Sequence, residues 1–396
     1  MDFNLTKEQE QLSDSIQRFV AREYAVDRRK EILKSKEGFS REVWGQLGEL
    51  GLLALLVPEE HGGMGAGPVE VMLTMNAIGK GLLLEPYLPS AVLGTALVRE
   101  LGSAEQKESI LPRLAAGEII VVPAHGEAGA RYDLERVETR ATASADGFVL
   151  EGKKAVVLHA PAADLLLVSA RTSGAVDDPA GISLFVVPRE TPGVSLQSYP
   201  TMDGQRAADV TLQKVRLPRS SLLGSAGGAF AALSAVFDAG VAALCAEAVG
   251  ALQASLDATI EYTKTRKQFG QPIGKFQALQ HRMADMLMHV EQAKSMSYLA
   301  TMRCTDPDAA ARRRAVSAAK VLIGQACRYV GQQSIQLHGG MGMTDELLIS
   351  HHFRRLAVIE LSLGDTEHHL EQFVRAEPRG RTAEARSAPR SEKERT

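Results

Sequence analysis

The chain has 396 residues, 45% of them hydrophobic, and a formal net charge of -3 at pH 7. This length implies two or three domains, and no apolar run is expected to be long enough to cross a bilayer. Three cysteines, at positions 245, 304 and 327, show neither a disulfide framework nor a metal-ligand spacing. Reduced thiols in a reducing compartment are therefore expected. Because the N-terminus has no basic or apolar leader segment, the predicted location is the cytoplasm.

Residues 1–118 are predicted to form an N-terminal α-helical domain. Thr6 and Gln9 have the spacing of a capping box, and the run that follows places Ile16 and Phe19 on one apolar face. The pattern changes at about residue 119. We therefore expect the first domain to end there.

Residues 119–224 consist of short runs of Val, Leu, Ile and Phe separated by Gly, Pro and Asp, as in 148–152 and 182–188. This pattern is typical of strands. Residues 225–375 return to long helical patterns, which predict an antiparallel four-helix bundle with helices near 226–264, 275–304, 308–337 and 363–375. Residues 376–396 have no large apolar residue and are expected to be a disordered tail.

The segment 266–277 is the most informative part of the chain. A long apolar pattern must stop where Gly270 and Pro272 interrupt it, which leaves Arg266 at the end of a helix. A guanidinium at that place offers a planar set of donors that suits a phosphate group. The alternative interpretation is a solvated arginine that interacts favourably with the helix dipole.

The same segment, together with Gln336 to Gly342 and several runs in the N-terminal third, resembles the acyl-CoA dehydrogenase family over about residues 3–375. The resemblance implies an α+β fold, with an N-terminal all-α domain, a middle β-barrel domain and a C-terminal four-helix bundle. It also implies FAD as the cofactor. In the family, the matching residues hold FAD across a dimer interface, and here they are Arg266, Gln268, Phe269, Gln277, Gln336, Gly339 and Gly340.

The implied reaction is α,β-dehydrogenation of an acyl-CoA thioester, in which a carboxylate removes the α-proton while a hydride passes from the β-carbon to the flavin. The sequence departs from the family at this carboxylate. The usual catalytic Glu position is Leu363, and the alternative position used by some members is Gly240.

Three other carboxylates are candidates for the base. Asp365 lies two residues beyond the lost Glu, although it would also suit the N-cap of the last helix. Glu247 lies in a nearly apolar stretch, where the alternative is a structural ion pair within the bundle. Asp238 follows Phe237 and is more typical of a contact with pantetheine or solvent. We rank them in the order Asp365, Glu247, Asp238.

The middle domain departs from the family too. The flavin-contacting loop is represented only by residues 124–133, and the strand that faces the flavin reads Val-Val-Leu-His at 156–159. A leucine at position 158 removes the expected hydroxyl donor. The chain's own middle domain is therefore expected to hold a flavin poorly.

Elements that reach a partner's FAD are thus kept, while those that serve the chain's own site are altered. This pattern, with the ending Leu363 to His369, resembles the small subunit of pimeloyl-CoA dehydrogenase and related heteromeric enzymes. We expect a homo- or hetero-oligomer, a dimer or an α2β2 tetramer, with an acceptor of the electron-transfer flavoprotein type. The alternative is a catalytically silent partner that completes the FAD site of a paralogue.

Other signals carry little weight. The pairs His351-His352 and His368-His369 lack the companions of a metal site, so no metal is predicted. The basic tail is more typical of a solvated terminus than of a nucleic-acid-binding arm, and no nucleic-acid partner is expected. The acyl group of the substrate is not specified by the sequence.

Overall fold

The computed structural model describes residues 4–376, and its first domain begins at the predicted capping box. Thr6 Oγ1 accepts a hydrogen bond from the Gln9 amide at 3.3 Å, and the Gln9 side chain accepts one from the Thr6 amide at 3.0 Å. The N-terminal domain is helical, as expected, with helices α1 (Lys7–Glu23), α2 (Val26–Lys34), α3 (Arg41–Glu49), α4 (Pro68–Gly81), α5 (Thr95–Leu101) and α6 (Ala104–Ala115), and the π-helical segment η3 (Tyr87–Gly94).

The middle domain is one eight-stranded sheet with the strand order β6-β7-β3-β2-β4-β5-β8, and β1 pairs with β4. The edge strands β6 and β8 do not pair with each other, so the hydrogen-bonded path stays open where the predicted barrel would close. The strands are β1 (Val121–Ala124), β2 (Arg140–Ala143), β3 (Gly147–Leu158), β4 (Leu165–Arg171), β5 (Ile182–Pro188), β6 (Val194–Pro200), β7 (Arg206–Pro218) and β8 (Leu222–Leu223).

The C-terminal domain is a bundle built on three long helices, α7 (Phe230–Thr265), α8 (Gln277–Arg303) and α9 (Ala309–His338). The fourth helix is α10 (Leu348–Leu361), which the sequence pattern did not reveal. Its buried side chains include His351, His352 and Arg355, and these polar residues interrupt the apolar periodicity. The helix predicted near 363–375 is α11 (Thr366–Arg375), a shorter element that packs against α9.

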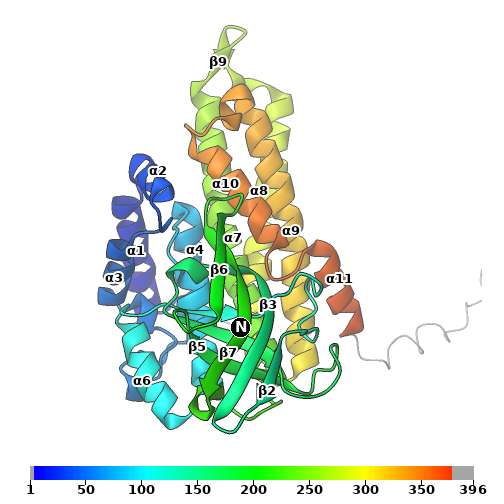
Figure 1. The fold of residues 1–396 in the computed structure, drawn as a ribbon. Helices are drawn as coiled ribbons and strands as arrows, with labels where there is room; N and C mark the ends of the chain where they lie inside the picture. The colour runs from blue at the N-terminus through cyan, green and yellow to red at the C-terminus, as the bar shows by residue number, and fades with distance from the viewer. Residues whose placement is uncertain (1–3, 377–396) are drawn as a thin grey trace, which may run out of the picture.

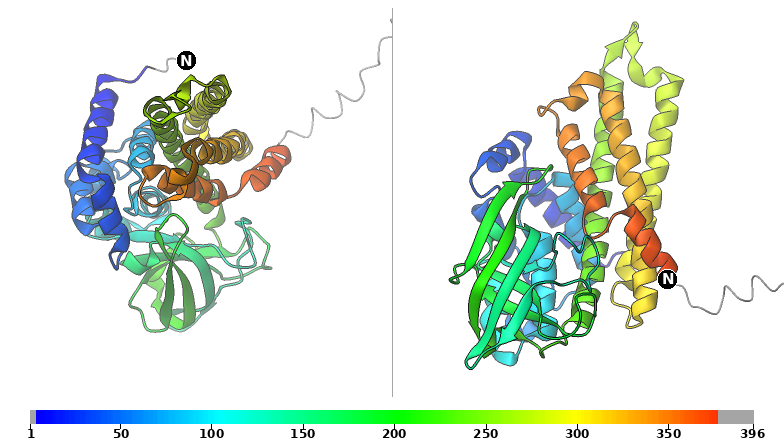
Figure 2. Two further views of the ribbon diagram at one scale, coloured as in Figure 1. Left: turned by 90° about the horizontal axis from the view of Figure 1, so that it is seen from above. Right: turned by 45° about the vertical axis from the view of Figure 1, so that its right-hand side comes forward.

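The three domains pack around α7, as Figure 1 and Figure 2 show. Helix α4 lies directly against α7 because glycines face each other's backbone. A Cβ on Gly79 would lie 1.9 Å from the carbonyl oxygen of Glu247, and one on Gly250 would lie 1.9 Å from that of Asn76. The two helices can approach this closely only because both positions lack a side chain.

Helix α7 also corrects one expectation. By length and composition it could cross a membrane, since its most apolar 18-residue window has a mean hydropathy of 1.7, but 83% of that window is buried inside the protein. It is therefore the central helix of the bundle. The predicted tail lies outside the described residues from position 377 onward.

Candidate functional site

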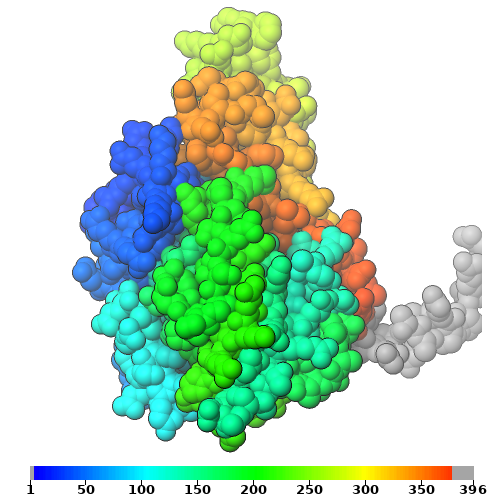
Figure 3. Space-filling model, in the orientation of Figure 1, coloured from blue at the N-terminus to red at the C-terminus, as the bar shows by residue number. Residues whose placement is uncertain are grey.

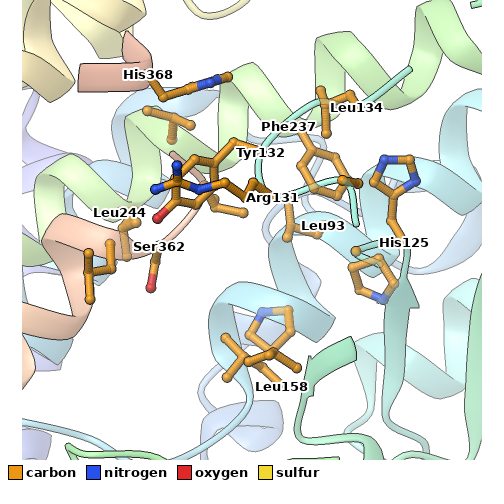
Figure 4. Close-up of a pocket in the computed structure, with 18 of the residues that line it drawn as sticks. Leu93, His125, Arg131, Tyr132, Leu134, Leu158, Phe237, Leu244, Ser362 and His368 are labelled. Atoms are coloured by element: carbon orange, nitrogen blue, oxygen red, sulfur yellow. The ribbon is translucent and has the colours of Figure 1, made fainter. Parts of the chain in front are cut away.

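A cavity of about 530 Å³ lies between the middle domain and the bundle. Helix α7 and the end of α10 form one wall, β3 and η3 form others, and the loop 125–134 after β1 crosses it. Figure 4 shows Arg131 and Tyr132 extending from this loop across the view of the cavity. The apolar side chains that line it include Leu88, Leu93, Leu158, Phe237, Val241, Leu244, Val358, Leu361 and Leu363.

The two positions at which the family carries its base lie next to each other beside this cavity, and one of them, Leu363, lines it. A Cβ on Gly240 would lie 3.4 Å from Leu363 Cδ1 and 2.6 Å from Leu93 Cδ2. The family resemblance therefore pointed to two positions that are neighbours in space. In this chain both are apolar, and leucine side chains occupy the space between them.

Buried side chains of α9 and α11 hold the loop that carries Leu363. Leu363 has a positive φ of 55°, which is unusual for a residue with a branched side chain. Its carbonyl accepts a hydrogen bond from His369 Nε2 at 2.9 Å, and the buried Lys320 donates to the carbonyls of Gly364 at 2.6 Å and Glu360 at 2.9 Å. Burial lowers the pKa of Lys320. The loop is thus fixed by buried donors from α9 and α11.

Asp365 forms the N-cap of α11, the alternative that the sequence also suggested. Its Oδ1 accepts a hydrogen bond from the His368 amide at 2.8 Å, and its Oδ2 lies 3.8 Å from Arg131 Nη2. Within residues 4–376, Asp365 is not one of the residues that line the cavity. The carboxylate is therefore engaged at the helix end and does not face the space where a substrate would lie.

Glu247 is buried in an ion pair, again the alternative reading from the sequence. Arg355 on α10 donates from Nε to Glu247 Oε1 at 2.6 Å and from Nη2 to Oε2 at 2.8 Å. The remaining Nη1 donates to Asp203, in the turn between β6 and β7, at 2.7 Å. Both oxygens of Glu247 are bound to one guanidinium. This leaves the carboxylate poorly placed to accept a proton from a substrate.

Asp238 lines the cavity but is neutralised by two arginines of α9. Arg312 Nε lies 2.9 Å from one oxygen and Arg313 Nε lies 2.5 Å from the other. The sequence suggested a pantetheine or solvent contact for Asp238. The structure instead gives it two protein partners.

A buried cluster beneath the loop 125–134 was not found from the sequence. Lys154 on β3 is fully buried and donates to Glu127 at 2.6 Å, to Ser169 Oγ at 3.0 Å and to the His125 carbonyl at 3.2 Å. Burial lowers the pKa of Lys154 to about 8 and that of His125 to about 3. In the sequence, the only sign of this cluster was a lysine, Lys154, directly before a run of apolar strand residues. The cluster anchors the start of the loop.

The strand that would face a flavin is irregular. The register between β3 and β7 shifts between Lys154 and Val157, and Val156 has a positive φ of 52°. Leu158 lines the cavity with an apolar side chain. His159, which follows it, is buried, and neither of its ring nitrogens has a hydrogen-bond partner among the described residues. The wall of the cavity therefore offers no hydroxyl at the place expected from the family.

The residues expected to contact FAD lie at the opposite end of the bundle. Helix α7 ends at Thr265 with Arg266 as its C-cap, and a tight hairpin follows, formed by β9 (Lys267–Gln268) and β10 (Gln271–Pro272). Phe269 at its turn is 91% exposed. Within residues 4–376 the guanidinium of Arg266 makes no hydrogen bond or ion pair. Gln268 and Gln277 are exposed beside it.

The second expected FAD element lies next to this hairpin. Tyr262 on α7 stacks on His338, with ring centroids 4.3 Å apart, and its hydroxyl donates to the His338 carbonyl at 3.3 Å. Gln336, Gly339 and Gly340 are exposed on the same side. The structure therefore brings the seven predicted cofactor residues together at one end of the bundle, here called the bundle tip (residues 266–277 and 336–343). Figure 3 shows this end projecting beyond the other domains.

The bundle tip and the cavity are far apart within one chain. Leu244 lines the cavity and Arg266 ends the same helix 22 residues later, which corresponds to roughly 33 Å along the axis. The residues expected to contact FAD therefore lie far from the cavity of the chain that carries them.

The bundle tip fits an anionic group that approaches from outside. A Cβ on Gly339 or Gly340 would meet nothing within 4 Å, so the chain itself imposes no steric need for glycine at these positions. Gly339 does require its positive φ of 61°, but Gly340 does not have a positive φ. A pyrophosphate that approaches the backbone closely would require positions without side chains, such as Gly339 and Gly340, near a free guanidinium such as that of Arg266.

Three family models match the chain in succession. They are the N-terminal domain of acyl-CoA dehydrogenase over residues 6–118, its middle domain over residues 124–215 and its C-terminal domain over residues 227–377. A probable acyl-CoA dehydrogenase of Bacillus subtilis, YngJ, is 32% identical over 372 residues, which cover 93% of this chain and 97% of that protein.

Solved structures agree with this result. The ChsE4-ChsE5 complex from Mycobacterium tuberculosis matches with a TM-score of 0.84 and 26% identity, covering 98% of this chain and all of the compared one. A variant of the Tcur3481-Tcur3483 steroid ACAD matches with a TM-score of 0.84 and 27% identity, over 96% and 99% of the two chains. The chain therefore belongs to the acyl-CoA dehydrogenase family, whose members use FAD to dehydrogenate acyl-CoA thioesters.

Proposed function

We propose that this chain is one subunit of a hetero-oligomeric, FAD-dependent acyl-CoA dehydrogenase, and that it completes the FAD site of a paralogous partner subunit. One observation carries the proposal. The positions of the family's base, Leu363 and Gly240, pack against each other as apolar neighbours, while the cofactor residues of the bundle tip are intact and face outward.

The carboxylates around the cavity support the same conclusion. Removal of an α-proton needs a carboxylate that is free to accept it and lies within reach of the substrate. Glu127 and Asp238 are held by buried or partly buried cations, and Asp133 is exposed. Among residues 4–376, no carboxylate that lines the cavity is therefore both buried and free of a cation. A partner subunit with an intact base would supply it.

The bundle tip would act on the partner's cofactor by binding and orienting it. FAD supplies the hydride-accepting chemistry of the reaction when it is bound. Arg266 would pair with its pyrophosphate, since a guanidinium fits phosphate oxygens with two parallel donors. Gly339 and Gly340 would allow the backbone to approach the same group, and the exposed Phe269 would cover an aromatic ring of the cofactor.

Other features of this function remain predictions. The acceptor of the electrons is expected to be of the electron-transfer flavoprotein type, and the predicted location is the cytoplasm. The related steroid ACAD is consistent with a bulky acyl group, such as a steroid side-chain or dicarboxylyl thioester. An α2β2 tetramer would pair each bundle tip of this chain with a cavity of the partner.

The flavin stoichiometry tests the proposal directly. The purified chain is expected to be colourless when expressed alone and yellow when expressed with a paralogous partner that has an intact Glu-Gly-Thr motif, with one FAD for every two chains. The complex should bleach when acyl-CoA is added. A yellow isolated chain with one FAD per chain that bleaches with acyl-CoA would instead establish a self-sufficient enzyme with a relocated base.

Arg266→Ala tests the role of the bundle tip. Loss of a charge-assisted contact is expected to weaken FAD binding by the complex roughly 10- to 100-fold, because such contacts contribute about 1.5–3 kcal/mol. The measurement is FAD retained after gel filtration. Arg303→Ala, at the other end of α8, is the matched control, since Arg303 pairs only with Asp306 within the described chain. Equal FAD retention in both variants would contradict the proposed contact.

A further inference from the structure

The segment 339–347, which begins in the bundle tip, carries the two glycines proposed to contact FAD and is exposed over most of its length. Met343, for example, is 75% exposed. Its first residues pack against α9, where a Cβ on Gly342 would lie 2.9 Å from the Ile335 carbonyl oxygen. Its last residues are held by α2 and α10, and one of these contacts is made by a buried side chain of α10, His351.

His351 is bonded on both ring nitrogens. Nδ1 lies 2.9 Å from Arg29 Nη1 on α2 and 3.3 Å from Arg354 Nη2, while Nε2 lies 3.1 Å from the carbonyl oxygen of Asp345. Arg29 is itself buried and is fixed by a 2.9 Å bond to the Leu82 carbonyl. The imidazole thus joins the N-terminal domain to the segment 339–347.

These contacts permit one protonation state of His351. A guanidinium is always a donor, so Nδ1 must accept from Arg29, and a carbonyl is always an acceptor, so Nε2 must carry the proton. The ring is therefore the neutral Nε2–H tautomer. A proton on Nδ1 would point at two guanidinium groups and would break the bond to the N-terminal domain.

Further contacts extend the same connection. Arg354 Nη2 lies 2.5 Å from Asp345 Oδ1, and Lys30 Nζ lies 3.4 Å from the Glu346 carbonyl. In both Figure 1 and Figure 2, α2 lies on the side of the bundle from which this orange segment projects. Helix α2 and α10 therefore hold residues 345 and 346, which follow the two glycines by only a few residues.

We propose that His351 is a positioning residue for the cofactor: in its neutral form it ties α2 to the segment 339–347 and holds Gly339 and Gly340 against the FAD of the partner subunit, and on protonation it releases them. The proposal rests on the proposed function for the contact with FAD. The tie between α2 and the segment is a property of this chain alone.

The charges around His351 favour its neutral form. From α2 it faces Arg29, and from its own helix it faces Arg354, with His352 beside it. From the preceding loop it faces Asp345. Burial lowers the pKa of His351, the hydrogen bond to the Asp345 carbonyl raises it, and Arg29 and Arg354 lower it further. The ring is thus neutral at pH 7, and its pKa lies below the usual range for histidine.

Hydrogen exchange of the full chain tests the tie without any cofactor. Exchange rates of the amides in 339–347, divided by their intrinsic rates, are measured at pH 7.5 and pH 5.5. Wild-type protection is expected to fall roughly tenfold more in this segment than in α6. His351→Gln keeps a hydrogen-bond acceptor and a donor but does not titrate. In this variant the protection of the segment 339–347 and that of α6 should therefore change equally with pH. His61→Gln, on a half-exposed histidine, is the control and should behave as wild type.

The same pH dependence of the segment in wild type and His351→Gln would overturn the proposal. If His351→Gln does not fold, Arg29→Met at pH 7.5 replaces it, and unchanged protection of 339–347 would be equally decisive. FAD retention by the heteromeric complex is then measured over the same pH range. Loss of FAD on acidification in wild type, but not in His351→Gln, is expected. Arg266→Ala tests the FAD contact separately. A failure of the proposed function can therefore be distinguished from a failure of the role proposed for His351.

Discussion

At the scale of single residues, three carboxylates that could act as catalytic bases instead make structural contacts. Asp365 caps α11, Glu247 is bound by Arg355, and Asp238 is bound by two arginines. Each role was one of the alternatives available from the sequence, except the arginine partners of Asp238. The chemistry of a carboxylate in this fold is decided by the cations that neighbouring helices bring to it.

Asp365 can be tested by two substitutions that separate a cap from a base. Asparagine caps a helix as well as aspartate does, so Asp365→Asn should change the free energy of unfolding little, whereas Asp365→Ala should lower it by about 1 kcal/mol. Urea unfolding of the isolated chain measures both. Turnover by the complex is expected to survive Asp365→Asn. Loss of turnover with unchanged stability and bound flavin would make Asp365 the proton acceptor.

At the scale of elements, the ion pair of Arg355 joins three of them. It connects α10 to α7 through Glu247 and to the turn between β6 and β7 through Asp203. This contact fixes the middle domain against the bundle at the wall of the cavity, which Arg355 lines. Its two carboxylates and one guanidinium are all buried, so removal of one partner leaves charge without compensation.

Glu247→Gln should therefore lower the free energy of unfolding by about 3 kcal/mol, in the range found when one partner of a buried pair is removed. Urea unfolding monitored by circular dichroism provides the measurement. Glu261→Gln is the control on the same helix, because Glu261 forms an exposed pair with Lys264 that should contribute little. Equal stability of the two variants would show that the Arg355 pair is not a significant support.

The elements also show how far the sequence predicts this molecule. The capping box at Thr6, the end of α7 at Arg266 and the strand-rich middle domain follow from local patterns, and all are present. Helix α10 was missed because buried ion pairs and histidines replace the apolar residues that a periodicity test counts. The Lys154 cluster was missed because its members lie far apart in the sequence, on β3, β4 and the loop after β1, and meet only in the folded domain. Local signals thus predict where elements are, but not which polar groups become partners.

At the scale of the whole molecule, buried neutral histidines make stability depend on pH. Burial lowers the pKa of His159 to about 4, and those of His125, His352 and His369 to about 3. The unfolded chain binds these protons at about pH 6.5, so stability is lost as pH falls below that value. Burial raises the pKa of Glu85 to about 7, and this group acts in the opposite direction.

The free energy of unfolding is therefore expected to fall by at least about 3 kcal/mol between pH 7.0 and pH 5.0, since each neutral histidine contributes up to about 1.4 kcal/mol per pH unit. Urea unfolding at the two pH values measures it. His159→Phe removes one titrating group beside Phe39 and should reduce the slope. A wild-type stability that is the same at both pH values would contradict the buried, neutral state of these rings.

The open space around Gly340 means that selection for folding and selection for cofactor binding act on different positions of this protein. A Cβ added there meets no atom of the chain, and the guanidinium of Arg266 is unpaired within residues 4–376. Substitutions at these positions should leave yield, melting temperature and proteolytic resistance of the isolated chain unchanged. A mutational screen for expression or folding would therefore score this pair of positions, Gly340 and Arg266, as freely variable. Only a screen that reports on the assembled, flavin-loaded complex would reveal its constraint.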